Sequence, residues 1–72
     1  MTQRVAKLDV VALTQDLPAE GLVRGQVGSV VEILAPDVFE VEFSDDSGRT
    51  YAQLPLKTEQ LLVLHTAPVP AA

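Results

Sequence analysis

Three glycines and one arginine stand within residues 21–28, and an apolar run over residues 30–34 follows almost at once. Glycine adopts backbone conformations that other residues avoid, and it lets neighbouring strands approach closely. A glycine-rich loop that leads into an apolar strand is typical of the first sharp corner of a small β-barrel. This stretch therefore constrains the fold more than any other part of the 72-residue chain.

Alternation predicts the clearest strand around residues 39–43. Phe39, Val41 and Phe43 occupy alternate positions, and Glu40 and Glu42 fall between them, so one face should be buried and the other wet. Other segments rich in β-branched or apolar residues are also expected to be extended: residues 9–14, 26–35, 49–54 and 61–64. The chain therefore contains five short strand candidates.

Residues 26–35 are unusual because both alternating faces carry apolar side chains. A sharp bend near Gly28 or Ser29 would present both sets to one core, so a bend is expected there. Further along, residues 44–48 predict a hairpin loop with Gly48 in the left-handed region. Tyr51 is expected to pair across that hairpin with the preceding strand.

Pro55 is expected to end the fourth strand, and residues 56–60 are too short for an α-helix and suit one 3-10 turn. Together these patterns predict an all-β fold, namely a five-stranded, partly open SH3-like barrel with one short 3-10 turn before the last strand. An OB-type barrel is the nearest alternative, but it normally needs a longer chain and a helix between its third and fourth strands.

The chain is expected to form one domain, with a flexible leader at residues 1–7, the barrel at 8–65 and a disordered tail at 66–72. No cysteine is present, which excludes disulfides and thiolate metal sites and suits a cytoplasmic location. No apolar stretch reaches the length of a membrane span, so no membrane association is expected.

Acidic residues outnumber basic ones by ten to five, which gives a net charge of −5. All ten acids lie within residues 8–65, whereas the bases there are only Arg24, Arg49 and Lys57. Such a surface repels phosphate backbones, so nucleic-acid binding is disfavoured. The apolar fraction of 47% is high for so small a chain and is compatible with a homodimer.

No residue pattern predicts a catalytic, cofactor-binding or metal site. His65 is the one histidine, and it follows the last strand without a nucleophile or carboxylate fixed beside it. Asp45 and Asp46 lack the alternating oxygen ligands of a calcium loop and suit a hairpin turn. The glycines of residues 21–28 precede a strand, whereas phosphate loops lead into a helix.

An acidic stripe is the strongest candidate for an interaction surface. Glu40 and Glu42 share the wet face of their strand, and Glu32 is expected to join them. Two interpretations remain open: a solvated outer face that keeps the protein soluble, or a docking surface for a basic partner. Arg24, the single base of the glycine-rich loop, completes the candidate interaction residues.

Six blocks of sequence carry a family resemblance: residues 9–13, 16–18, 21–32, 40–43, 48–52 and 61–62. In this order they resemble a family of short uncharacterised bacterial proteins, described as a domain of unknown function. The resemblance implies an SH3-like barrel but no established activity and no site residues. Residues 24–30 are more loosely similar to the KOW segment of ribosomal and transcription proteins, but those segments carry several bases, and here Arg24 stands alone.

The sequence therefore favours a small, acidic, non-catalytic protein-interaction module without a cofactor, acting as an accessory or regulatory partner of an unidentified protein. A KOW-like module associated with nucleic acid is the alternative, supported by Arg24 and the strand that follows it. An enzyme is the least favoured class, because a chain of this size without a nucleophile and base pair has little room for a pocket.

Overall fold

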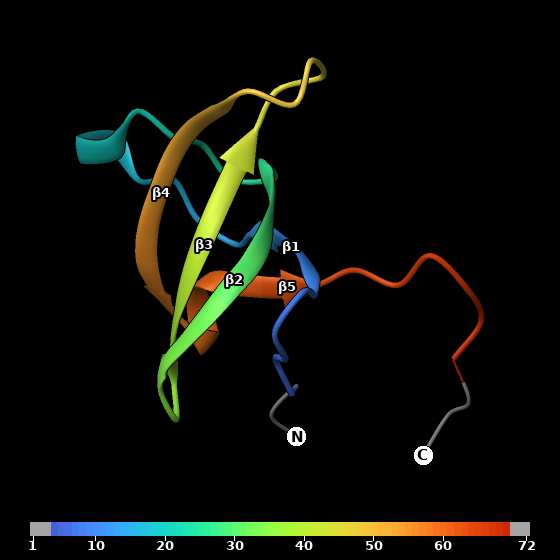
Figure 1. Cartoon of the computed structure of the whole chain (residues 1–72). Helices are drawn as coiled ribbons and strands as arrows, with labels where there is room; N and C mark the ends of the chain where they lie inside the picture. Colours follow the sequence, from blue (N-terminus) through green and yellow to red (C-terminus); the bar gives the residue numbers. More distant parts are fainter. Residues whose placement is uncertain (1–3, 70–72) are drawn as a thin grey trace.

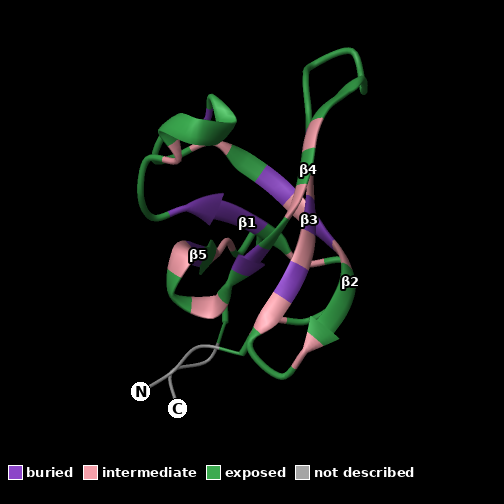
Figure 2. Cartoon of the chain, turned by 90° about the vertical axis from the view of Figure 1, so that its left-hand side faces the viewer, coloured by how far each residue is buried: buried purple, intermediate pink, exposed green. Residues whose placement is uncertain are grey.

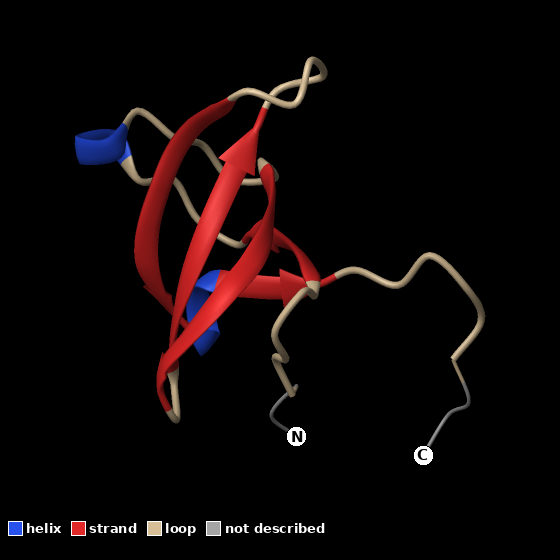
Figure 3. Ribbon diagram, viewed as in Figure 1, coloured by secondary structure: helices blue, strands red, loops and turns tan. Residues whose placement is uncertain are grey.

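The computed structural model describes residues 4–69, which form one antiparallel five-stranded sheet with strand order β4-β3-β2-β1-β5 (Figure 1). The strands are β1 (Val10–Leu13), β2 (Val27–Ala35), β3 (Val38–Ser44), β4 (Thr50–Lys57) and β5 (Leu61–Val63). Two 3-10 turns, η1 (Pro18–Glu20) and η2 (Thr58–Gln60), are the helical elements of the described residues (Figure 3). Because β4 and β5 lie at opposite ends of the strand order, the sheet is not closed. The prediction of five strands with a 3-10 turn before the last is confirmed.

The two ends of the described chain differ in their contacts. Ala6 donates its backbone N–H to the Asp9 carboxylate at 2.8 Å, Leu8 donates to the Val30 carbonyl at 2.7 Å, and Val5 packs against the core. After β5, Leu64 still donates its N–H to the Val10 carbonyl at 2.9 Å, and the chain then runs away from the sheet (Figure 1). Residues 1–3 of the predicted leader and 70–72 of the predicted tail lie outside the described residues, and the flexibility of both ends stays a prediction.

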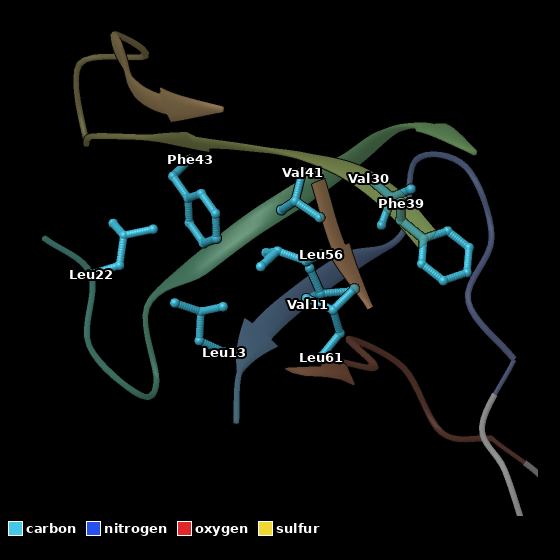
Figure 4. Close-up of a cluster of buried hydrophobic side chains, with 9 residues drawn as sticks. All are labelled: Val11, Leu13, Leu22, Val30, Phe39, Val41, Phe43, Leu56 and Leu61. Atoms are coloured by element: carbon cyan, nitrogen blue, oxygen red, sulfur yellow. The ribbon is translucent and has the colours of Figure 1, made fainter. Parts of the chain in front are cut away.

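The core lies on one face of the bent sheet and receives side chains from all five strands and from the loop between β1 and β2 (Figure 4). Its buried members are Val11, Leu13, Leu22, Val30, Phe39, Val41, Phe43, Leu56 and Leu61. No polar side chain is buried in the part of the chain that the structure describes. The buried face predicted for β3 is therefore confirmed, and burial of aliphatic and aromatic surface is what holds the sheet in its bent shape.

Two β-bulges in β2 bend the strand. Val30 pairs with Val41 and Glu32 with Glu40, so Val31 is an extra residue in β2. A second register shift between Ile33 and Ala35 leaves Leu34 without a direct partner. Each extra residue bends the strand and reverses the alternation of its side chains. The bend was predicted at Gly28 or Ser29, whereas the irregular pairs follow Val30.

Gly28 lies inside β2 where this strand meets β3. A Cβ atom at Gly28 would lie 2.8 Å from the Glu42 carbonyl oxygen and 2.9 Å from Val41 Cγ1. It would also lie 3.0 Å from Phe43 Cδ2. These distances are shorter than van der Waals contact, so the site admits only a residue without a side chain. Close packing of β2 on β3 is therefore the reason for glycine at this position.

β4 continues through Pro55 to Lys57, which corrects the prediction that the strand ends at Leu54. Thr58 donates its N–H to the Asp37 carbonyl at 3.2 Å, and hydrogen-bonded positions alternate along an antiparallel pair. The backbone N–H and C=O groups of Leu54 and Leu56 therefore point toward β3, and the backbone nitrogen of Pro55 points away from it. Because β4 is an edge strand, the missing N–H of Pro55 costs no hydrogen bond within the sheet.

The β3–β4 hairpin has the predicted chemistry. Asp45 accepts hydrogen bonds from the backbone N–H groups of Ser47 at 2.9 Å and Arg49 at 3.0 Å, and Gly48 has a φ of 83°. The rings of Phe43 and Tyr51 are tilted, with centroids 6.3 Å apart, so the predicted cross-hairpin pair is confirmed. Asp45 thus builds the turn with its side chain.

The loop between β1 and β2 contains the turn η1. Leu17 and Leu22 exchange two backbone hydrogen bonds of 2.9 and 3.2 Å around it, and Gly21 ends it with a φ of 70°. This small closed loop delivers Leu22 to the core beside Phe43 (Figure 4). A long loop with its own core residue is held in one place by burial.

We expect Gly28→Ala to lower the free energy of unfolding by about 1–3 kcal/mol, because the added methyl group meets a backbone oxygen and two core side chains that have little room to move. A loss of 1 kcal/mol lowers the melting temperature of a domain of this size by about 4–8 °C. Thermal and urea unfolding followed by circular dichroism measure the change.

Ser29→Ala is the matched control, since Ser29 is the next residue of β2 and its side chain is half-buried on the other face. We expect this control to stay within about 0.5 kcal/mol of the parent. Equal stability of Gly28→Ala and Ser29→Ala would show that β2 and β3 do not approach as closely as described.

Candidate interaction surface

The three glutamates of the predicted acidic stripe lie on the outer face of the sheet, opposite the core. Glu32 pairs directly with Glu40 across β2 and β3, and Glu42 is two residues further along β3. Strict alternation from Val30 would turn Glu32 toward the core. The bulge at Val31 reverses the alternation and places Glu32 beside Glu40. The name acidic stripe refers below to Glu32, Glu40 and Glu42.

Hydrogen bonds and one distant cation moderate the charge of the acidic stripe. Gln53 donates to Glu40 Oε2 at 3.2 Å, and Thr50 donates to Glu42 Oε2 at 2.8 Å. Lys7 Nζ lies 3.8 Å from Glu32 Oε1 with both side chains well exposed. Like charges that face each other across a strand pair are unfavourable, and an exposed ion pair offsets little of that cost. The acidic stripe therefore stays attractive to positive groups from outside.

Arg24 lies apart from the acidic stripe, in the loop that enters β2. Its backbone N–H donates to Asp16 Oδ1 at 2.8 Å, and the next residue, Gly25, donates to the Leu13 carbonyl at 2.8 Å. Arg24 lines an open hollow of about 500 Å³ with residues of β1 and β5: Ala12, Leu13, Thr14, Gly25 and Leu62. The structure thus brings three of the four predicted residues together and sets the fourth beside a different group of side chains.

A row of apolar side chains crosses the outer face beside that hollow. Ala12 pairs with Leu62 of β5 on one side and with Val27 of β2 on the other, so the three side chains share one face. Leu62 is 53% exposed and Val27 is 46% exposed, whereas Ala12 between them is buried but lies outside the main core cluster. Figure 2 shows that most of β1 has the colour of buried residues. This group, called the outer row below, consists of Leu62, Ala12 and Val27.

The outer row was not predicted from the sequence. Residues 10–13 are all apolar, which is a signal that both faces of β1 carry apolar side chains. The signal alone does not show which residues of other strands stand beside them, because that depends on the register of β1 with β2 and β5. Only the strand pairing in the structure shows that Ala12 lies between Val27 and Leu62.

The outer row and the acidic stripe form one continuous surface. Ser29 of β2 pairs with Val10 on one side and with Glu42 on the other. Val10 precedes Ala12 by two residues on the same face of β1, and Ser29 follows Val27 in the same way on β2. The outer face therefore changes from apolar to acidic across the width of a few strands, with Arg24 at its apolar end.

The remaining candidates occupy places where the chain uses them for structure. Gly21 and Gly25 donate their N–H groups to the Pro18 and Leu13 carbonyls, and Gly28 packs against β3, so the three do not form a phosphate cradle. Within residues 4–69 no group of three or more histidine, cysteine or acidic side chains is placed to hold a metal ion. His65 lies past the end of β5. None of the helical turns in that range has the length and apolar character of a membrane span.

Comparison with known proteins identifies a family for most of the chain. The model of the family described as "Domain of unknown function (DUF4926)" matches residues 7–63, a range that begins just before β1 and ends with β5. No curated protein and no solved structure gives a significant match. The predicted membership of an uncharacterised domain family is confirmed, since the matched range covers the whole sheet: the chain belongs to the family of this domain of unknown function, DUF4926.

Proposed function

We propose that this domain is a non-catalytic protein-binding module and that the outer face of its sheet is the surface that docks. The observation that carries the proposal is the outer row, in which Leu62, Ala12 and Val27 stand in register across three strands. An antiparallel sheet with one face on a core normally presents polar side chains on its other face. The outer row places apolar side chains on that exposed face, where another molecule can cover them.

The acidic stripe supports a partner with positive groups. A protein interface commonly has an apolar centre and a polar rim, and charge on the rim steers association and selects among partners. Here Ser29 joins the outer row to Glu42, so one partner surface can meet both. The partner that this surface fits has an apolar patch flanked by lysine or arginine. Of the two interpretations of the acidic stripe, docking is therefore the one we propose.

The proposal of a non-catalytic role has a separate support. A catalytic site needs a nucleophile or a base that is held in place by a third group. Within the described part of the chain, His65 donates or accepts no hydrogen bond with a carboxylate or hydroxyl side chain. An accessory or regulatory role in a complex fits such a domain better than turnover.

We expect the double variant Val27→Thr, Leu62→Gln to lose binding to the partner while the domain stays folded. The substitutions remove apolar surface at two exposed positions and leave the core unchanged. Cross-linking in a lysate of the source organism, with mass spectrometry of proteins captured by the parent and the variant, measures the loss. One or more proteins should be captured about tenfold more by the parent than by the variant. A tenfold change in affinity corresponds to the loss of at least one buried apolar side-chain contact.

The double variant Ile33→Thr, Leu34→Gln is the matched control. These residues also lie in β2 and are 47% and 52% exposed, but they stand beyond the bulge at Val31. Capture should persist with this control. Equal capture by parent and Val27→Thr, Leu62→Gln, or loss with the control alone, would contradict docking on the outer row.

A homodimer through the outer row would also contradict the proposal of a separate partner. Sedimentation equilibrium of the parent at about 10–500 µM distinguishes a monomer from a homodimer, since a dimer with a dissociation constant in this range would dissociate as the protein is diluted. We expect a monomer at all concentrations. A dimer that the Val27→Thr, Leu62→Gln variant abolishes would assign the outer row to a second copy of the chain.

Binding of nucleic acid, the KOW-like alternative, is expected to be absent at physiological salt. The surface carries ten acids against five bases, and the loop that would bind phosphates contributes only Arg24. Titration of labelled single-stranded RNA and duplex DNA by fluorescence anisotropy tests this. Binding below about 10 µM that weakens steeply as salt increases would restore the alternative.

A further inference from the structure

The hollow beside Arg24 has the composition of a specific binding pocket. Its volume of about 500 Å³ lies within the usual range for sites that take a small group. Ala12 and Leu62 supply apolar surface, and Arg24 supplies the positive charge. Thr14 adds a hydroxyl oxygen that donates to the Glu59 carbonyl at 2.8 Å and retains its capacity to accept.

The loop that carries Arg24 is held in place by hydrogen bonds on both sides. Val23 donates its N–H to Gln26 Oε1 at 2.6 Å, Arg24 donates to Asp16 Oδ1 at 2.8 Å, and Gly25 donates to the Leu13 carbonyl at 2.8 Å. A side chain on a fixed backbone loses less freedom on binding than one on a mobile loop. The backbone of Arg24 is thus held in place before any partner arrives.

The guanidinium of Arg24 has no carboxylate within ion-pair distance among residues 4–69, where the one ion pair joins Lys7 to Glu32. Asp16 accepts a hydrogen bond from the backbone N–H of Arg24. A cation without a partner on a strongly acidic protein, at the edge of an apolar hollow, is suited to a carboxylate from another molecule. Arginine is well matched to such a group because it can donate two parallel hydrogen bonds.

We propose that this hollow is the specificity pocket of the docking surface and that it takes an apolar side chain together with an adjacent aspartate or glutamate of the partner protein. The apolar side chain lies on Leu62 and Ala12, and the carboxylate binds the Arg24 guanidinium. The inference rests on the proposed function and deepens it. The partner then carries an acid for Arg24 at one end of the interface and bases for the acidic stripe at the other.

Blocked dipeptides test the chemistry of the pocket without the partner. The full chain is titrated by heteronuclear NMR with N-acetyl-leucyl-glutamate amide, and separately with its glutamine and lysine counterparts. The glutamate form should move the amide resonances of Thr14, Gly25 and Leu62 and the side-chain resonance of Arg24, with saturation in the millimolar range expected of so small a ligand. The glutamine form should bind about tenfold more weakly, because it lacks the charge-assisted contact.

The variant Arg24→Gln should remove the preference for glutamate over glutamine, and Arg49→Gln is the matched control. Arg49 is also a base without an ion pair in the described residues, but it lies in the β3–β4 hairpin loop. The Arg49→Gln variant should give the same three titrations as the parent. Absence of shifts with the glutamate dipeptide, equal binding of the three dipeptides, or an unchanged preference in Arg24→Gln would each overturn the pocket assignment.

The two proposals fail in different ways. If Val27→Thr, Leu62→Gln loses its partner but the dipeptides do not bind, docking on the outer face stands and the pocket assignment is wrong. If the dipeptides bind as expected but capture is equal for parent and variant, the pocket chemistry stands and the docking proposal is wrong.

Discussion

The close approach of β2 to β3 at Gly28 is the constraint on which the remaining structure depends. β2 is the one strand that pairs with both β1 and β3, so its position fixes the sheet on either side. With no side chain at Gly28, β3 can place Val41 and Phe43 against the core at this level. The same contact sets Ser29 opposite Glu42 on the outer face. Core packing and outer-face chemistry are therefore two consequences of a single strand contact.

The bulges of β2 extend this coupling along the strand. A regular β2 would carry Glu32 on the core face, where a buried carboxylate without a partner is strongly unfavourable. The extra residue Val31 turns Glu32 outward and bends the strand around the core in one step. The acidic stripe thus arises from the same irregularity that lets the sheet wrap. The register of β2 with β3 accounts for its assembly, and docking is the role that we propose for it in addition.

Local patterns predicted those features whose physical cause lies within a few residues. The alternation of Phe39, Val41 and Phe43 showed the buried face of β3, and the Asp45 to Gly48 loop showed the hairpin. Pairing between distant strands has no such local signature. The outer row, the position of the bulges and the separation of Arg24 from the acidic stripe all depend on register. The extension of β4 through Pro55 depends on its place at the sheet edge, which is also a property of the whole fold.

The two chemistries of the outer face impose an order on any complex that covers it. Removal of apolar side chains from water is favourable in free energy, whereas removal of carboxylates from water is unfavourable unless a positive partner replaces their hydration. The outer row is therefore suited to the dry centre of an interface, and the acidic stripe to a margin that keeps water. Arg24 stands at the opposite margin with the opposite sign. A partner that lies across this face the wrong way round meets like charges at both margins. In the complex that we propose, the electrostatic polarity of the surface would therefore fix the orientation of the partner, and the outer row would supply most of the stability.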